Sequence, residues 1–498
     1  MRRSSGILMP VFSLPGKYGI GDFGKSSYEF VDFLHASGQK FWQILPLVQT
    51  GFGNSPYSSV SSRSISPYYI SIEKLFEQGL LNKEELELSV YQEECISYGF
   101  LHSVRMPLLK KAFLRFDKQD KKFCSFVKKG SARDYALFMS LKSVFEDKPF
   151  YEWQKEYKYR DQKTLKAFEK DNEDEVLFWQ FIQYLALSQW KSVKQYANKK
   201  GIKIIGDMPL YVALDSVDVW VDPSLYKLDK KFKPKKVAGV PPDYFCADGQ
   251  LWGNPVYDYA KHKKQGYKWW ADRILNALSV FDYVRIDHFR GLDRYYEIEY
   301  GAPNARQGEW KKVPSKALFS AIHKMVDKSR IIAEDLGIID DGVRALLKRV
   351  GYPGMKILSF AFNGEKDNLY LPENLIENSV CYTGTHDNDT LLGLISSSND
   401  WDKGNLYNGV RNSLANMGMK MPVENDDDLR KAIIELGFAS RANLFLMPMQ
   451  DVLGMGSQMR INEPGTVKAQ NWSVRFKQEH FSLEKAKELK ALCKKYNR

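Results

Sequence analysis

Three short segments hold the side chains whose types and spacing suit catalysis: 285–291 (RIDHFRG), 333–337 (AEDLG) and 385–389 (THDND). Each segment lies at the end of an apolar, β-rich run that finishes in a carboxylate, and about 50 residues separate one segment from the next. This is roughly the spacing of strand–helix units in a large parallel barrel, where catalytic groups lie at the C-terminal ends of the strands. Three converging carboxylates with an Arg and a His beside them are typical of acid, base and nucleophile chemistry on a glycosidic bond.

The candidate catalytic residues, one from each segment, are Asp287, Glu334 and Asp387. Arg285 precedes Asp287 by two positions, and because side chains alternate along a strand, both point to the same face. A fixed cation at that place favours an ionised Asp287. A single carboxylate at a barrel end would more often form a structural ion pair, so the interpretation rests on the whole set. We expect the neighbouring Asp335 and Asp389 to support the site.

Short apolar runs bounded by turn residues predict eight β-strands, at 7–12, 41–47, 202–212, 282–287, 330–335, 355–362, 379–384 and 443–449. Apolar residues at helical spacing lie between most of these runs, as at 26–38 and 176–201, and both of these segments end at a glycine. The alternation predicts an α/β fold, a (β/α)8 TIM barrel with inserted subdomains at its C-terminal face.

We expect one catalytic barrel over residues 1–498, because no internal repeat or low-complexity linker divides the chain. Two connections are too long for simple crossovers. The first, at about 51–175, is rich in charge and helical patterns and predicts a mainly helical subdomain. The second, at about 213–281, contains the Gly/Pro-punctuated segment 238–259 and predicts an active-site lid region. Long insertions after barrel strands usually build the rim of the site.

Composition argues against several classes of protein. The net charge of +12 lies largely in lysine-rich runs such as 227–236, without the arginines and interleaved aromatics of a nucleic-acid surface, so we expect no nucleic-acid partner. No apolar run approaches the roughly 20 residues that span a membrane, and Pro10 interrupts the N-terminal apolar stretch, which makes a poor signal peptide. Five scattered cysteines favour a reducing cytoplasm over a disulfide framework or zinc site. The 14% aromatic content suits stacking on sugar rings.

One motif favours a different class of protein. Residues 19–26 (GIGDFGKS) match both the G-x-G-x-x-G and the P-loop patterns, and they lie between a predicted strand and a predicted helix, so a nucleotide hydrolase remains a remote alternative. However, SLPGKY separates the strand from the loop, and Asp22 would place a carboxylate inside a cradle for phosphate. The simpler interpretation is a Gly-rich surface loop ahead of the first barrel helix.

Taken together, the motifs resemble those of the 4-α-glucanotransferases of the amylomaltase (disproportionating enzyme) family, a transferase branch of the α-amylase-like clan. The resemblance runs from SLPGKYGIGDFG at 13–24 to RINEPGT at 460–466, and it includes GDMPLYV at 206–212, GQLWGNPVY at 249–257 and GMKILSFAF at 354–362. It implies transfer of α-1,4-glucan segments between maltooligosaccharides by a retaining double displacement that needs no metal and no cofactor.

The resemblance also implies a role for each matched residue. Asp287 would be the nucleophile, Glu334 the general acid and then base, and Asp387 the group that holds sugar hydroxyls and stabilises the developing positive charge. Glu334 must then have a raised pKa, so that it is protonated near neutral pH. The matched substrate-binding residues are Tyr57, Asp207, Trp252, Arg285, His386 and Asn462.

The sequence departs from the family pattern at Asn363, Ile461, Glu463 and Val474, where Asp, Met, Thr and Trp are common. These departures bear on subsite affinity and acceptor preference. The main alternative is a hydrolase of the same clan, because hydrolysis and transfer start from the same glycosyl intermediate. A carbohydrate-binding protein without activity is disfavoured by the presence of all three carboxylates. The oligomeric state and the preferred chain length stay open.

Overall fold

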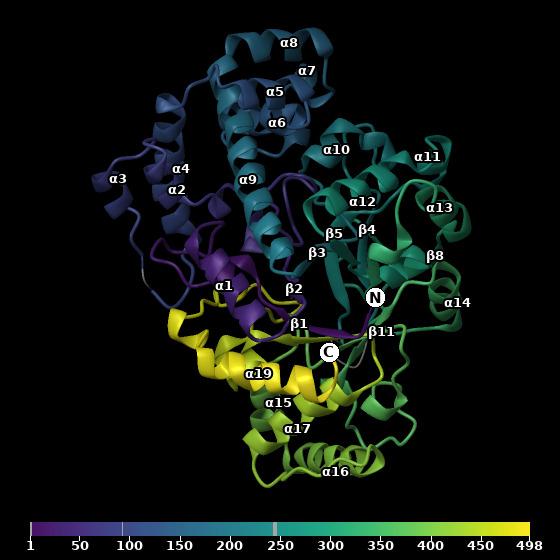
Figure 1. The fold of residues 1–498 in the computed structure, drawn as a ribbon. Coiled ribbons are helices and arrows are strands. Elements are labelled where there is room, and N and C mark those ends of the chain that lie inside the picture. Colours follow the sequence, from purple (N-terminus) through teal and green to yellow (C-terminus); the bar gives the residue numbers. More distant parts are fainter. Residues whose placement is uncertain (1, 92, 243–246) are drawn as a thin grey trace.

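Eight parallel strands close into a barrel in the computed structural model, which describes residues 2–91, 93–242 and 247–498 (Figure 1). The strands follow one another around the barrel in the order β1-β12-β11-β10-β9-β6-β3-β2. Their bounds are β1 Ser4–Leu8, β2 Phe41–Gln43, β3 Lys203–Met208, β6 Tyr283–Ile286, β9 Ile331–Ala333, β10 Gly354–Ile357, β11 Ser379–Tyr382 and β12 Leu444–Pro448. The closed parallel barrel confirms the predicted (β/α)8 fold class.

Each predicted strand overlaps a barrel strand, but the predicted bounds were too long. The first strand was misplaced at 7–12, since β1 ends at Leu8 and a 3-10 turn covers Val11–Ser13. Pro10 has no N–H group to donate to a neighbouring strand, so the ladder cannot continue through it. Similarly, β10 ends at Ile357, where a 3-10 turn begins. The apolar residues beyond these ends are buried in the core instead of paired in the sheet.

Helices surround the barrel, and α1 packs against both α9 and α19, which brings the two ends of the chain together (Figure 1). The predicted helices at 26–38 and 176–201 are confirmed as α1 and α9. The helices that accompany the barrel are α1 Lys25–Ala36, α9 Glu173–Lys199, α12 Lys268–Val280, α13 Ser315–Ile322, α14 Asp341–Val350, α15 Leu391–Ser397, α16 Asp400–Asn416, α17 Asp426–Ala439, α18 Met449–Leu453 and α19 Leu483–Lys495. None of the described helices is both long and apolar enough to cross a membrane.

The connection from β2 to β3 contains further helices before α9. Helices α5 to α8 project at one end of the molecule, opposite α16 and α17 (Figure 1). They are anchored on α9, which contacts α4, α5, α6 and α8. The bounds in this connection are α2 Ile72–Glu77, α3 Lys83–Glu87, α4 Tyr98–Arg115, α5 Lys121–Lys129, α6 Arg133–Val144, α7 Lys155–Lys158 and α8 Gln162–Asp171.

A separate four-stranded antiparallel sheet, in the order β5-β4-β7-β8, was not predicted. Its strands come from the connections on either side of β6, so the sheet joins two segments that the sequence does not mark as partners. The bounds are β4 Lys236–Val240, β5 Gln250–Pro255, β7 Arg294–Glu299 and β8 Gly308–Lys312, and two short helices, α10 Val217–Val221 and α11 Tyr259–Lys264, flank β4 and β5 in sequence. Part of the predicted lid segment, residues 243–246, lies outside the described residues.

The P-loop-like segment 19–26 is not a phosphate cradle. Asp22 is buried, accepts a hydrogen bond from the Gly24 amide at 2.8 Å, and pairs with Arg105 at 3.3 Å. A Cβ atom at Gly21 would lie 2.0 Å from the carbonyl oxygen of Val11, so the loop is packed against its own chain. The prediction of a surface loop was therefore wrong, because the glycines of this segment allow close packing inside the core.

Gly206, one residue before Asp207 in β3, provides a test of the barrel packing. A Cβ atom there would lie 2.0 Å from the Phe281 ring. We expect Gly206→Ala to lower the free energy of unfolding by about 1–3 kcal/mol, because overpacking forces neighbouring groups to shift. The matched control is Gly404→Ala in α16, where no atom lies within 4 Å of the added methyl group and the variant gains helix propensity. Equal melting temperatures for the two variants would contradict this packing.

Candidate active site

The three candidate catalytic residues, together with Asp207 and Arg285, lie at the C-terminal ends of barrel strands. Asp207 and Arg285 lie near the ends of β3 and β6, and their backbones are register partners. Asp287 follows β6 directly, Glu334 follows β9, and Asp387 lies beyond β11. Parallel strands bring these ends together at one rim of the barrel, which is where the sequence placed the site.

Arg285 lies at the centre of the charge arrangement. Its guanidinium contacts both oxygens of Asp207, at 2.8 and 2.7 Å, and one oxygen of Asp287 at 3.1 Å. Its remaining Nε donates to the sulfur of Met355 at 3.3 Å. The Asp207 and Arg285 side chains are buried, whereas Asp287 is partly open, with 26% of its side chain exposed. The fixed pair thus holds Asp287 in place and leaves it accessible to a ligand.

Glu334 has different partners from Asp287. Its two carboxylate oxygens accept backbone hydrogen bonds from His288 at 2.6 Å and from Leu336 at 2.7 Å. His288 adopts a left-handed backbone conformation with φ of 48°, which turns its N–H toward Glu334. Glu334 is therefore oriented by amides, without a cation in direct contact among the described residues.

The environments of these two carboxyl groups shift their pKa values. Burial raises the pKa of Glu334 to about 6, while Arg285 and the two amide hydrogen bonds oppose the rise. Burial also raises the pKa of Asp287 well above its usual range. Arg285 opposes that shift, and the nearby carboxylates add to it. Arg285 does favour the ionised form of Asp287, as the sequence predicted. However, the effect of burial on the pKa of Asp287 is larger than the effect of Arg285.

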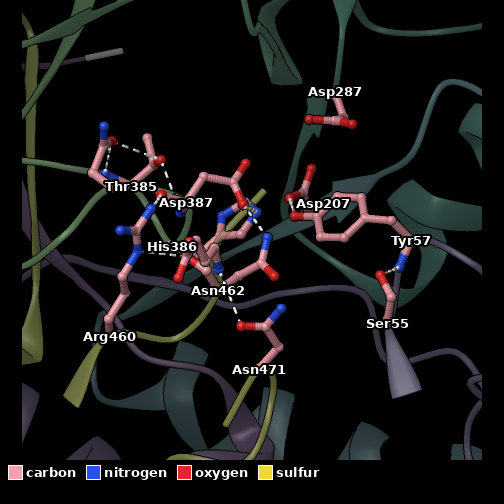
Figure 2. A network of polar contacts seen from close by, with 12 residues as sticks. Ser55, Tyr57, Asp207, Asp287, Thr385, His386, Asp387, Arg460, Asn462 and Asn471 are labelled. Carbon is pink, nitrogen blue, oxygen red and sulfur yellow. Dashed lines mark hydrogen bonds and ion pairs between the residues drawn. The ribbon is translucent and has the colours of Figure 1, made fainter. Parts of the chain in front are cut away.

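Asp387 is held by a second polar network, shown in Figure 2. The side-chain amide of Asn462 donates to Asp387 Oδ1 at 2.7 Å, and His386 Nε2 lies 3.4 Å from the same oxygen. Arg460 donates to the backbone carbonyl of Asp387 at 2.7 Å. Asn462 therefore orients Asp387, a structural contact that its predicted substrate-binding role does not include.

Tyr57 links the two networks (Figure 2). Its hydroxyl donates to Asp207 at 2.5 Å, and its ring stacks on His386 with 5.2 Å between centroids and 9° between planes. Trp472 packs against the same two rings, at 5.8 Å from Tyr57 and 5.9 Å from His386. Burial lowers the pKa of His386, so its imidazole is neutral at physiological pH.

Trp252 reaches the site from the antiparallel sheet. It lies on β5 with 37% of its surface exposed, and it meets the His288 ring edge to face at 4.8 Å. Tyr211 flanks it at 6.1 Å. Trp252 is therefore brought next to the residue that follows Asp287, and the contacts place it at the edge of the site instead of on the carboxylates.

Sequence reasoning missed several residues of this site, namely His288, Met355, Lys356, Arg460 and Trp472. His288 follows Asp287 directly, and histidine is among the residues that tolerate left-handed backbone, but nothing in the sequence marked its amide as a donor to Glu334.

Asp335 and Asp389 turn away from their neighbours. Asp335 accepts from Met355 and Asp389 from Ser457, at 2.5 and 2.7 Å. Within the described chain, no group of three or more His, Cys, Asp or Glu side chains is arranged to hold a metal ion.

The sequence model of the 4-alpha-glucanotransferase family matches residues 9–480. The chain belongs to the 4-alpha-glucanotransferase family. A 4-alpha-glucanotransferase of Clostridium butyricum is 42% identical over 98% of this chain and 100% of its own length. An amylomaltase from Streptococcus agalactiae, solved in complex with acarbose, superposes with a TM-score of 0.94 at 37% identity and covers 100% of both chains. An amylomaltase from Corynebacterium glutamicum shares the fold, with a TM-score of 0.80 at 18% identity over 100% of this chain and 75% of its own.

Family membership confirms the resemblance and, with it, the predicted retaining 4-α-glucanotransferase function. The nucleotide-hydrolase alternative gains support neither from these comparisons nor from the packed loop at 19–26. The individual roles of the site residues remain predictions.

The hydrogen bond between Tyr57 and Asp207 can be tested without an activity assay. Tyr57→Phe keeps the ring on His386 but removes a donor to a buried carboxylate. We expect the free energy of unfolding to fall by roughly 1.5–3 kcal/mol, the usual value of a hydrogen bond to a charged group. Tyr300→Phe is the matched control, because Tyr300 is 55% exposed. Equal changes in urea denaturation for the two variants would contradict the described contact.

Proposed function

We propose that Asp287 is the nucleophile and Glu334 the general acid and base of a retaining glucan transfer. The observation that supports this most directly is the different surroundings of the two carboxyls. Asp287 contacts the fixed cation of Arg285 at 3.1 Å, whereas Glu334 accepts hydrogen bonds from the backbone amides of His288 and Leu336 at 2.6 and 2.7 Å. Two carboxyls with such different environments are suited to opposite roles in acid–base chemistry.

In the first step, a carboxylate oxygen of Asp287 forms a bond to the anomeric carbon. The electron pair of the broken glycosidic bond goes to the leaving oxygen, which takes the proton of Glu334. In the second step, ionised Glu334 removes a proton from the acceptor hydroxyl, whose oxygen displaces Asp287 from the anomeric carbon. Each step inverts the configuration, so the product retains it. Neither step requires a metal or a cofactor.

Asp387 would bind hydroxyl groups of the sugar at the reaction centre and stabilise its developing positive charge. Its hydrogen bond from Asn462 leaves the second carboxylate oxygen for the ligand. His386, neutral and stacked on Tyr57, supplies a donor beside it. Asp207 would act mainly through Arg285 and Tyr57, which occupy its oxygens.

We propose α-1,4-glucans and maltooligosaccharides as the substrates. The acarbose bound to the similar amylomaltase from Streptococcus agalactiae supports a glucan-type ligand. Transfer instead of hydrolysis requires an acceptor sugar to be held better than water. Trp252, partly exposed beside His288, offers an aromatic face for such an acceptor. We further propose that residues 51–175 and 213–281 act as insertions on a single catalytic barrel, the second as a lid.

We place the protein in the cytoplasm, on the ground of its cysteines. Cys95, Cys124, Cys381 and Cys493 are free thiols, and two of them are exposed. Exposed free thiols suit a reducing compartment.

Incubation with maltotriose tests the proposed reaction. We expect glucose together with longer maltooligosaccharides at a constant total of reducing ends, because each transfer breaks one bond and forms another. Asp287→Asn should lower the rate by about a thousandfold or more, since the covalent step needs the carboxylate. Asp341→Asn, on the exposed first turn of α14, is the matched control and should keep the wild-type rate. A rise in reducing ends without longer products would make the protein a hydrolase.

The pH dependence tests the role of Glu334. The general acid must be protonated, so kcat/KM should fall as the pH rises through about 6, the pKa of the free protein. Because Asp287 titrates in the same cluster, the apparent pKa values of the kcat/KM profile belong to Asp287 and Glu334 together. Fluoride leaves without a proton, so with an α-maltosyl fluoride donor the rate of glycosylation should no longer fall at high pH. Persistence of the same fall with the fluoride would contradict the assignment.

A further inference from the structure

We propose that Asp335 and Lys356 form a positioning pair that holds the end of β9 against β10 and sets the charge next to Glu334. The inference rests on the role proposed for Glu334 and concerns two residues that do not contact the reacting atoms.

The first argument is the geometry of the barrel at this place. Strands β9 and β10 are joined in register at Ala333 and Gly354, whereas β10 and β11 pair along the whole of β10. Just beyond Gly354, the amide of Met355 donates to the side chain of Asp335 at 2.5 Å. The carboxylate of Asp335 thus takes the place of a backbone acceptor and extends a short ladder by one bond.

Gly354 shows how closely the two strands approach. A Cβ atom at this position would lie 2.6 Å from an oxygen of Asp335, so only glycine leaves room for the carboxylate. The second oxygen of Asp335 pairs with the Lys356 ammonium at 3.2 Å. The Asp335 side chain is 6% exposed and the Lys356 side chain 21% exposed, so water screens the pair only weakly.

The second argument is the connection from this pair to the catalytic carboxyls. Asp335 is the immediate neighbour of Glu334, so anchoring it on β10 fixes the backbone from which Glu334 projects. On the same strand, the sulfur of Met355 accepts from Arg285, the residue that holds Asp287. Displacement of β10 would therefore disturb both carboxyls at once.

The third argument is electrostatic. The negative charge of Asp335 raises the pKa of Glu334, and Lys356 opposes the burial that raises the pKa of Asp335 itself. Burial raises the pKa of Tyr370 to about 12, and Asp335 and Glu334 both add to that rise, which places the phenol near the two groups. The charged and titratable groups around Glu334 on the packed elements include Arg285, Asp287, His288, Asp335, Lys356, Tyr370 and Tyr382. Of these, Asp335 is the carboxylate with no proposed contact to substrate.

The experiment is the pH profile of kcat/KM for maltotriose in variants of this pair. Asp335→Asn removes a negative charge beside Glu334. The carboxyl of Glu334 should therefore lose its proton at lower pH. We expect the basic limb to move down by about 0.5 pH units or more. Lys356→Arg keeps both the charge and the pairing and should leave the limb in place. Asp341→Asn, a fully exposed carboxylate, is the control for a nonspecific loss of charge.

Asp335→Asn could fail to fold, because its amide group would face the Lys356 ammonium. The double variant Asp335→Asn/Lys356→Gln restores a neutral hydrogen-bonded pair and should shift the limb in the same direction by a smaller amount. A folded single or double variant with lower kcat and an unmoved limb would overturn the proposal, since a structural role alone changes the rate without changing the pH profile. If the wild-type protein does not disproportionate maltotriose, the proposed function fails, and that result is distinct from an unmoved limb.

Discussion

The site depends on the buried ion pair between the guanidinium of Arg285 and the carboxylate of Asp207. A cation with 3% of its side chain exposed is costly to bury, and it is tolerated because Asp207, fully buried beside it, accepts two hydrogen bonds from it. That pair leaves one part of the guanidinium for Asp287. Asp287, the proposed nucleophile, is therefore held by a pair that is formed before substrate arrives, as preorganised catalysis requires.

The chemistry follows from placing two carboxyls on adjacent strands with unlike partners. Asp287 lies beside a permanent cation and is partly open, whereas Glu334 is buried and held by the amides of His288 and Leu336. Burial raises the pKa of both carboxyls, and Arg285 opposes the rise at both, so what distinguishes them is the direct ion pair at Asp287 and the amide hydrogen bonds at Glu334. In the proposed mechanism, one strand end presents the acid and its neighbour presents the nucleophile, and both groups are carboxyls.

The sequence predicted the parts of this arrangement that depend on local order. Carboxylates at the ends of apolar runs marked Asp287, Glu334 and Asp387, and their spacing indicated barrel units. It did not predict contacts between segments far apart in the chain. The sheet of β4, β5, β7 and β8 forms from two connections, and its central pair, β4 with β7, joins segments on opposite sides of β6, so no local pattern marks them as partners. The hydrogen bond from the His288 amide to Glu334 could not be predicted, because it depends on the positive φ of His288, which the sequence does not specify.

The most direct test of this account is to trap the glycosyl intermediate. In Glu334→Gln, an α-maltosyl fluoride donor should still glycosylate the protein, because fluoride leaves without a proton, but the missing base should stop its removal. Mass spectrometry of peptides from the quenched reaction should then find the added maltosyl group on the peptide that contains Asp287, and specifically on that side chain. Attachment to another carboxylate, or formation of product with inverted configuration and no attached sugar, would contradict the assignment of Asp287 as nucleophile.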